Sequence, residues 1–188
     1  MDIFSLEKVL NEVGLTEWCV VKADSLLAEI FPWVKSILVY YIPFIGLSKR
    51  NVFSKMIEAC RKSSEIGFYV VSKLQSLGVF AQYIPPFTNL PLEKYAEEGG
   101  LGVVGRNGRL VTPRYGPRVV VAGVALDKVF EKKQALGDFN PCENCLACTA
   151  FCPVGAIGLS SVKTYKCVFC LSCVLVCPIG IKYNEEFI

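Results

Sequence analysis

The 188-residue sequence contains no histidine. Without imidazole side chains, the chain cannot supply a histidine ligand to a bound metal. Charged residues are also scarce, at 20%, and a net charge of +3 is too small to indicate nucleic-acid binding, which depends on several clustered cations. With 53% apolar residues, the sequence predicts a folded protein that leaves apolar surface for a ligand or partner.

Long uninterrupted apolar segments are missing as well. The longest candidate for a membrane span, "IFPWVKSILVYYIPFIGL", is broken by Lys35 and two prolines, so it falls short of the roughly 20 residues that a bilayer requires. We expect a buried strand there and no membrane association. The first residues, "MDIFSLEKVLNEVG", contain acids and lack the basic segment of a secretion signal. The sequence therefore predicts a cytoplasmic protein.

Turn residues divide most of the chain into alternating helices and strands. Apolar spacing predicts helices over 5–14, 52–77 and 90–98, each ending at a glycine. Runs rich in β-branched and aromatic residues predict strands of a sheet covered on both faces. These runs are "WCVVKA", "KSILVYYIPF", "VFAQYI" and "RVVVAGVAL". The order indicates an α/β fold. The polar segment "EKKQALGDFN" predicts a boundary near Asp138, between domains of residues 1–138 and 139–188.

Eight of the ten cysteines form an internal repeat, with each position displaced by 25 residues and a proline after the last cysteine of each block. Cysteines at intervals of three can ligate different irons of one [4Fe-4S] cluster, and in this pattern the cysteine before proline ligates the other cluster. We therefore predict two clusters. The ligands of the first are Cys142, Cys145, Cys148 and Cys177, and those of the second are Cys167, Cys170, Cys173 and Cys152.

Zinc and disulfide bonds are the alternatives for these thiols. Zinc prefers separated pairs of cysteines, and disulfides belong to small secreted proteins, so the spacing favours clusters. An apolar shell around the thiols disfavours added negative charge and predicts low-potential electron carriers. Its members are Leu146, Phe151, Val154, Ile157, Val168, Phe169, Leu175 and Ile179. Cys19 and Cys60 lie outside the repeat, and we expect them to pack in the core.

The segment "EEGGLGVVGRNGRLVTPRYGPRVVVAGVALD" combines glycines with four arginines and has no acid between Gly99 and Leu126. Exposed backbone N–H groups beside guanidinium groups suit an anionic or amide-rich ligand. Alternatively, the arginines are solvated or cover the cluster domain. Gly100, Gly102 and Gly105, with Asp127, also fit the dinucleotide pattern, but that pattern requires glycines between a strand and a helix, and here they follow a helix.

This segment, followed by the cysteine repeat, resembles the corrinoid-dependent iron-sulfur reductases, which include epoxyqueuosine reductase and, more distantly, the reductive dehalogenases. The likeness is strongest over residues 99–177. It implies a nitroreductase-like α/β domain that holds cobalamin, followed by a small two-cluster ferredoxin-like domain that receives electrons from a low-potential donor protein. It also implies a cofactor site formed by Gly102, Gly105, Arg106, Asn107, Arg109 and Tyr115. Tyr83 and Tyr115 are the candidate proton donors.

The chain departs from these enzymes in two places. It is shorter between Phe44 and Val52, where little material is left to cap a corrin. Thr88 and Asn89 precede the helix before the glycines, where epoxyqueuosine reductases have an acid, so a small-molecule and a tRNA substrate both stay open. The other functions left open are a non-catalytic electron-transfer module that docks a partner enzyme and a flavin-dependent reductase. A homodimer is also left open.

Overall fold

The computed structural model describes residues 3–159 and 161–182. Its elements, in chain order, are α1 Ile3–Glu12, β1 Trp18–Lys22, α2 Ser25–Ile30, β2 Ser36–Pro43, α3 Val52–Ser76, β3 Ala81–Ile84, α4 Leu92–Glu98, β4 Val103–Val104, β5 Leu110–Val111, β6 Val119–Leu126, α5 Ala147–Ala150, the 3-10 turn η1 Thr164–Lys166 and α6 Ser172–Leu175. No helix of the described segments is long and apolar enough to span a bilayer.

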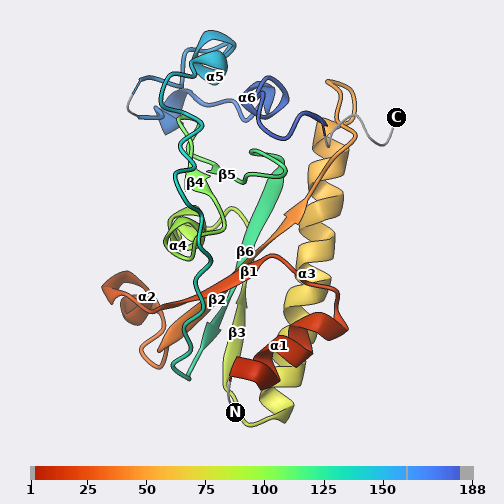
Figure 1. Cartoon of the computed structure of the whole chain (residues 1–188), viewed down its shortest axis with the longest axis vertical. Coiled ribbons are helices and arrows are strands. Elements are labelled where there is room, and N and C mark those ends of the chain that lie inside the picture. The colour runs from red at the N-terminus through yellow and green to blue at the C-terminus, as the bar shows by residue number, and fades with distance from the viewer. Residues whose placement is uncertain (1–2, 160, 183–188) are drawn as a thin grey trace.

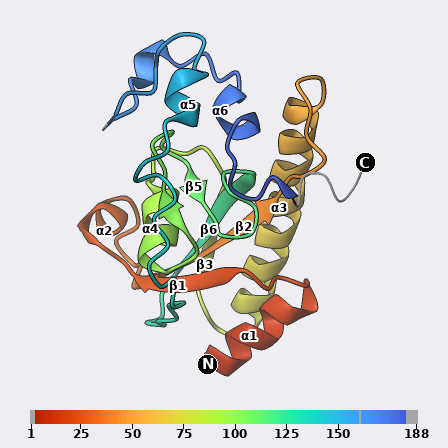
Figure 2. The same cartoon turned by 45° about the horizontal axis from the view of Figure 1, so that its top comes forward.

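A four-stranded sheet forms the centre of the fold (Figure 1). The strand order is β1-β2-β6-β3, and every neighbouring pair is antiparallel. Alternate residues of the strands enter two separate apolar clusters, because successive side chains point to opposite faces. Helices α1 and α3 cover one face and α4 covers the other (Figures 1 and 2). The predicted α/β class and the sheet covered on both faces are confirmed.

The predicted helices and strands are all present. Gly14 and Gly78 follow α1 and α3 with φ of 66° and 76°, the left-handed region that ends a helix most easily at glycine. Sequence reasoning missed α2, where the Asp24 carboxylate accepts a hydrogen bond from the Leu27 N–H at 2.9 Å. It also missed that β4 and β5 form a hairpin within the glycine-rich segment.

Part of the polar connection after β6, residues 131–140, is attached to the sheet. It runs beside β1 and α4 (Figure 1). Lys132 pairs with Val20 of β1, and the Gln134 N–H donates to the Gly99 carbonyl at 2.9 Å. The start of the connection is therefore bound to the α/β layers, and the domain boundary near Asp138 stays a prediction.

The cysteine-containing region, residues 142–182, lies at one end of the sheet, beyond β4 and β5 (Figures 1 and 2). Its two short helices differ in their contacts with the rest of the protein. Leu171 and Val174 of the α6 segment join the same apolar cluster as Val52 and Met56 of α3. No residue of α5 is buried. Apolar packing thus attaches the region to the core of the sheet through its second half.

Candidate functional site

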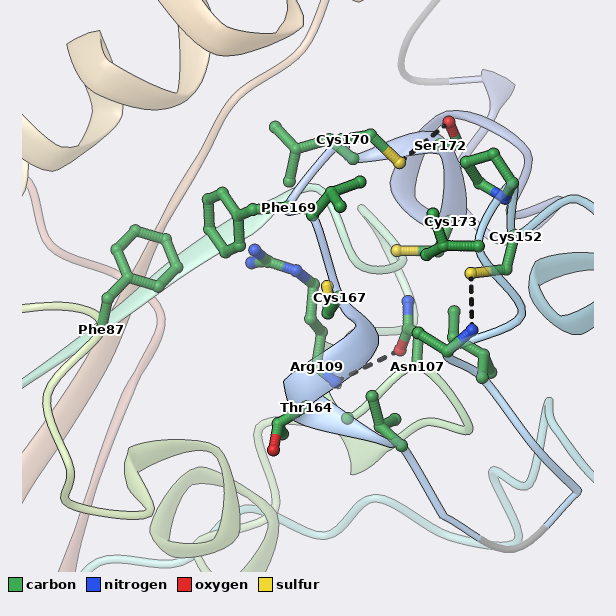
Figure 3. Close-up of a pocket in the computed structure, with 18 of the residues that line it drawn as sticks. Phe87, Asn107, Arg109, Cys152, Thr164, Cys167, Phe169, Cys170, Ser172 and Cys173 are labelled. Carbon is green, nitrogen blue, oxygen red and sulfur yellow. Dashed lines mark hydrogen bonds between the residues drawn. The ribbon is translucent and has the colours of Figure 1, made fainter.

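The eight repeat cysteines line two neighbouring cavities. A four-iron cluster needs a ring of thiolates, each on a different iron. The smaller cavity is lined by the first three cysteines of the repeat together with Cys177. The larger, of about 380 Å³, is lined by Cys167, Cys170 and Cys173 together with Cys152 (Figure 3). These are the groupings expected from exchange of the cysteine before proline, and Cys173 borders both cavities.

The described residues contain no group of three Cys, Asp or Glu side chains close enough to hold a single metal ion. The assignment of the cysteines to two clusters therefore stays a prediction. The donor chemistry fits it, because all eight thiols lie on the two cavity walls.

The β4–β5 turn approaches the first cysteine block closely. A Cβ on Gly105 would lie 2.7 Å from the Val111 side chain and 3.3 Å from the Cys142 Sγ. Only glycine fits comfortably at this distance, so Gly105 shapes the first cavity through its missing side chain. Gly102 allows a close approach within the hairpin itself, because a Cβ there would lie 2.5 Å from the Val111 carbonyl oxygen.

Cys152 differs from the buried cysteines of both blocks in its surroundings. Burial raises the pKa of Cys148, Cys173 and Cys177. Burial acts in the same direction on Cys152, but hydrogen bonds from backbone N–H groups outweigh it and lower the pKa of that thiol. The Ala156 N–H, for example, donates to the Cys152 Sγ at 3.2 Å (Figure 3). The backbone after Cys152 thus favours the thiolate that a metal requires.

Arg106, expected to face a cofactor, instead contacts the backbone of the first cysteine block. Its Nε donates to the carbonyls of Cys142 and Cys145, at 2.9 and 3.1 Å. Its two terminal nitrogens donate to the carbonyls of Glu143, at 2.8 Å, and Leu159. All its donor nitrogens are therefore used within the cysteine-containing region.

Arg118, just before β6, makes the matching contacts with the end of the second block. This side chain is only 1% exposed. It donates to the carbonyls of Ile179 at 2.6 Å, Cys177 at 2.8 Å and Leu175 at 3.3 Å. Among the roles predicted for the arginines, Arg106 and Arg118 have the one in which they cover the cysteine-containing region.

Arg109 and Asn107 are the two expected cofactor residues that line the larger cavity. The Arg109 guanidinium points toward Phe87 and Phe169, with ring centroids at 5.4 and 5.3 Å (Figure 3). Burial lowers the pKa of Arg109, but a guanidinium stays charged at neutral pH. The Asn107 Oδ1 accepts from the Arg109 N–H at 3.2 Å, which fixes the turn. Sequence reasoning missed Phe87.

The two candidate proton donors lie apart from this cavity. The Tyr83 hydroxyl lies 3.3 Å from the hydroxyls of Ser63 and Ser64 on α3. Tyr115 is half-buried against Tyr41, on the face of the sheet that α4 covers. Of the set expected around a corrinoid, Arg106, Asn107 and Arg109 line the two adjoining cysteine cavities, whereas Tyr83 and Tyr115 line neither. The cofactor site itself stays a prediction.

Two further expectations can be assessed from the geometry. Asp127 lies at the end of β6 opposite the glycine-rich segment, where it accepts from the Phe80 N–H at 3.1 Å, so a dinucleotide fingerprint is not formed. Five members of the predicted apolar shell line a cavity together with the cysteines, Val154, Ile157, Val168 and Phe169 at the larger one and Ile179 at the smaller one. Leu146 and Phe151 line neither cavity and are exposed. The low potential expected from this shell stays a prediction.

The two cysteines outside the repeat are packed as expected. Cys19 is fully buried on β1, and burial raises the pKa of its thiol to about 12. Cys60 is half-buried on α3. The structural role predicted for Cys19 is confirmed, and Cys60 packs at the edge of the core.

Known proteins support the sequence resemblance. No protein-family model matches the chain. The tetrachloroethene reductive dehalogenase of Dehalobacter restrictus is 33% identical over 96 residues, which are 50% of this chain and 17% of that protein. Epoxyqueuosine reductase of Staphylococcus aureus is 34% identical over 74 residues, 39% of this chain and 19% of that protein. The resemblance to the corrinoid-dependent iron-sulfur reductases is confirmed. The chain spans less than a fifth of these curated relatives.

Solved structures show the same fold at low sequence identity. A catabolic reductive dehalogenase in complex with 3-bromo-4-hydroxybenzoic acid aligns with a TM-score of 0.75 and 14% identity, over 94% of this chain and 31% of that one. An epoxyqueuosine reductase with a tRNA-Tyr stem loop aligns with a TM-score of 0.71 and 16% identity, over 95% of this chain and 65% of that one. The structure of a further reductive dehalogenase, which suggests a mechanism for B12-dependent dehalogenation, aligns with a TM-score of 0.72 and 16% identity, over 97% of this chain and 32% of that one.

Proposed function

We propose that the chain is an oxidoreductase that passes electrons through two [4Fe-4S] clusters held by its eight repeat cysteines. The observation that supports this most is the exchange of Cys152 and Cys177 between the two cavities. Zinc sites and disulfides give no reason for such an exchange, whereas it is typical of two-cluster ferredoxins. When bound, the clusters would supply single-electron transfer. Their sites share Cys173 on their walls, which keeps them adjacent.

Two polar atoms that are buried without a partner in the described part of the chain belong to residues that adjoin the first cysteine set, although neither residue lines the first cavity. Within the described residues, the Arg118 Nε and the Thr149 Oγ1 are buried without a hydrogen-bond partner. Both residues adjoin first-cluster cysteines, since Thr149 follows Cys148 and Arg118 contacts the Cys177 carbonyl. Buried donors are normally paired, and cluster sulfurs accept hydrogen bonds. A cluster would supply the acceptors that these two groups lack.

Single cysteine-to-serine substitutions test the assignment of ligands to the two clusters. Wild-type protein reconstituted anaerobically should contain about eight irons per chain. We expect Cys177→Ser and Cys152→Ser each to retain about four, with different paramagnetic resonance signals, because each variant loses a different cluster. Cys60→Ser is the matched control and should keep the full count. Retention of about eight irons by both repeat variants would contradict the proposal.

The electron acceptor is a separate question. A corrinoid is favoured by the B12-dependent relative, but the six expected residues do not line one cavity, since Asn107 shares the larger cavity with Arg109 and the smaller one with Arg106. A corrinoid would thus need residues beyond this set. The larger cavity is lined by the second cysteine set together with Arg109, Phe87 and Phe169. An electron acceptor that docks in this cavity would lie beside the second cluster. We propose a low-potential protein as the donor.

An anaerobic cobalamin titration of the cluster-loaded protein separates the alternatives. Stoichiometric binding, with a Co(II) signal that lacks nitrogen coupling, would favour a corrinoid, because the chain has no histidine to ligate cobalt. Intact clusters without cobalamin binding would favour an electron-transfer module that serves a partner enzyme. A yellow chromophore distinct from the cluster absorbance would indicate a flavin instead.

A further inference from the structure

The proposed first cluster has a discontinuous ligand set. Three of its cysteines lie within residues 142–148, and the fourth, Cys177, follows the whole second block. The cysteine-containing region must therefore bring two distant segments together before this cluster can be bound. Both segments contact the α/β layers through an arginine.

Arg106 and Arg118 each contact one of these segments. The Arg106 guanidinium donates to the carbonyls of Cys142, Glu143 and Cys145. The Arg118 guanidinium donates to the carbonyls around Cys177. Arg106 belongs to the β4–β5 turn and Arg118 precedes β6, so the hairpin and the central sheet fix the distance between the two segments.

Two glycines allow the backbone beside Arg118 to approach the segment that contains Cys177. Gly116 and Gly180 have positive φ, of 57° and 73°. A Cβ on Gly180 would lie 2.7 Å from the Gly116 nitrogen, so the two backbones touch directly beside Arg118. The Arg118 side chain is only 1% exposed beside this contact, so losing its hydrogen bonds would leave buried polar groups without partners.

We propose that Arg106 and Arg118 are positioning residues that hold the two halves of the first cluster's ligand set in place. This inference rests on the proposed two-cluster function. The carbonyls that they bind lie in segments 142–159 and 175–179, and none belongs to a ligand of the second cluster. Arg109 is the arginine beside the second set. The two cations also favour the more negative reduced state of the first cluster.

The test uses protein that carries one cluster at a time. In Cys152→Ser protein, which retains the first cluster, we expect Arg118→Met to speed loss of iron to a chelator about tenfold or more, because a buried hydrogen-bonded charge is lost. We also expect a lower reduction potential. In Cys177→Ser protein, which retains the second cluster, the same substitution should leave both values unchanged. Arg118→Lys keeps the positive charge but not the full set of hydrogen bonds. It should therefore restore the reduction potential more completely than the resistance to iron loss.

Controls separate this inference from the proposed function. Arg114→Met removes an exposed arginine of the same segment and should change neither cluster. If the wild-type and Arg114→Met proteins contain far fewer than about eight irons per chain, the proposed function itself fails. If they contain them, and Arg118→Met affects both clusters equally or only the second, the positioning role is overturned. Should Arg118→Met not fold by circular dichroism, Arg106→Met decides the matter in the same assay.

Discussion

The two cysteine blocks have the same spacing but are held in the protein by different forces. Leu146 and Leu171 occupy the same place in the repeat, yet Leu146 is 47% exposed and Leu171 only 3%. Three positions later, Thr149 of the first block corresponds to Val174 of the second, which is fully buried. The cysteines are equivalent, and the residues between them are not.

This difference separates two tasks within one repeat. The second block packs apolar side chains into the core beside α3, so hydrophobic burial fixes it. The first block buries no residue of α5 and is held by the hydrogen bonds of Arg106 to its carbonyls. Cysteine spacing thus specifies what the repeat binds, while the intervening residues specify how each half attaches to the sheet.

Truncating the two equivalent leucines should produce the largest contrast. We expect Leu171→Ala to reduce the free energy of unfolding by about 2–5 kcal/mol, because it leaves a cavity in the core. Residue 171 has a left-handed backbone with φ of 58°, which is about equally unfavourable for leucine and alanine. The loss of stability therefore comes from the lost side-chain packing. Leu146→Ala should change stability by less than about 0.5 kcal/mol. Anaerobic denaturant titration measures both. Equal losses would mean that α5 is also packed against something in solution.

Removing the metal should affect the two halves unequally. After chelation of the iron, we expect amides of residues 142–152 to exchange with solvent at least about tenfold faster, which corresponds to about 1.4 kcal/mol. Amides of α6 should keep most of their protection, since Leu171 and Val174 remain in the core. Strand β6 provides the internal reference. Equal loss of protection in both halves would show that α6 depends on the metal for its packing.

Much of this architecture could be predicted from the sequence. Glycine stops and apolar periodicity located α1, α3 and α4, and runs of β-branched residues located the four sheet strands. These signals are local, because each depends on residues within one element. The cysteine grouping could also be anticipated, since the repeat spacing carries it.

Other features depend on contacts between distant segments and could not be predicted. Four arginines near glycines suggested either a ligand site or a cover for the cluster domain, but only the fold shows that Arg106 and Arg118 are the two that bind backbone carbonyls far along the chain. Apolar residues around the thiols predicted a shell, but only the fold shows which of them line a cavity beside the thiols. The left-handed conformation of Phe87, with φ of 61°, has no sequence signal because this residue type rarely adopts it.

The smallest expected effect concerns Thr149, the polar counterpart of Val174. Its buried hydroxyl has no partner within the described residues, and a first cluster would offer a sulfur acceptor. Thr149→Val removes the hydroxyl at constant shape, so we expect the potential of the first cluster to fall by about 20–60 mV, the equivalent of one hydrogen bond. Potentiometric titration in Cys152→Ser protein measures this shift, and the same change in Cys177→Ser protein should have none. A stability gain of about 1 kcal/mol without a change in potential would show instead that the hydroxyl is unpaired in the loaded protein, and that the two halves differ in packing alone.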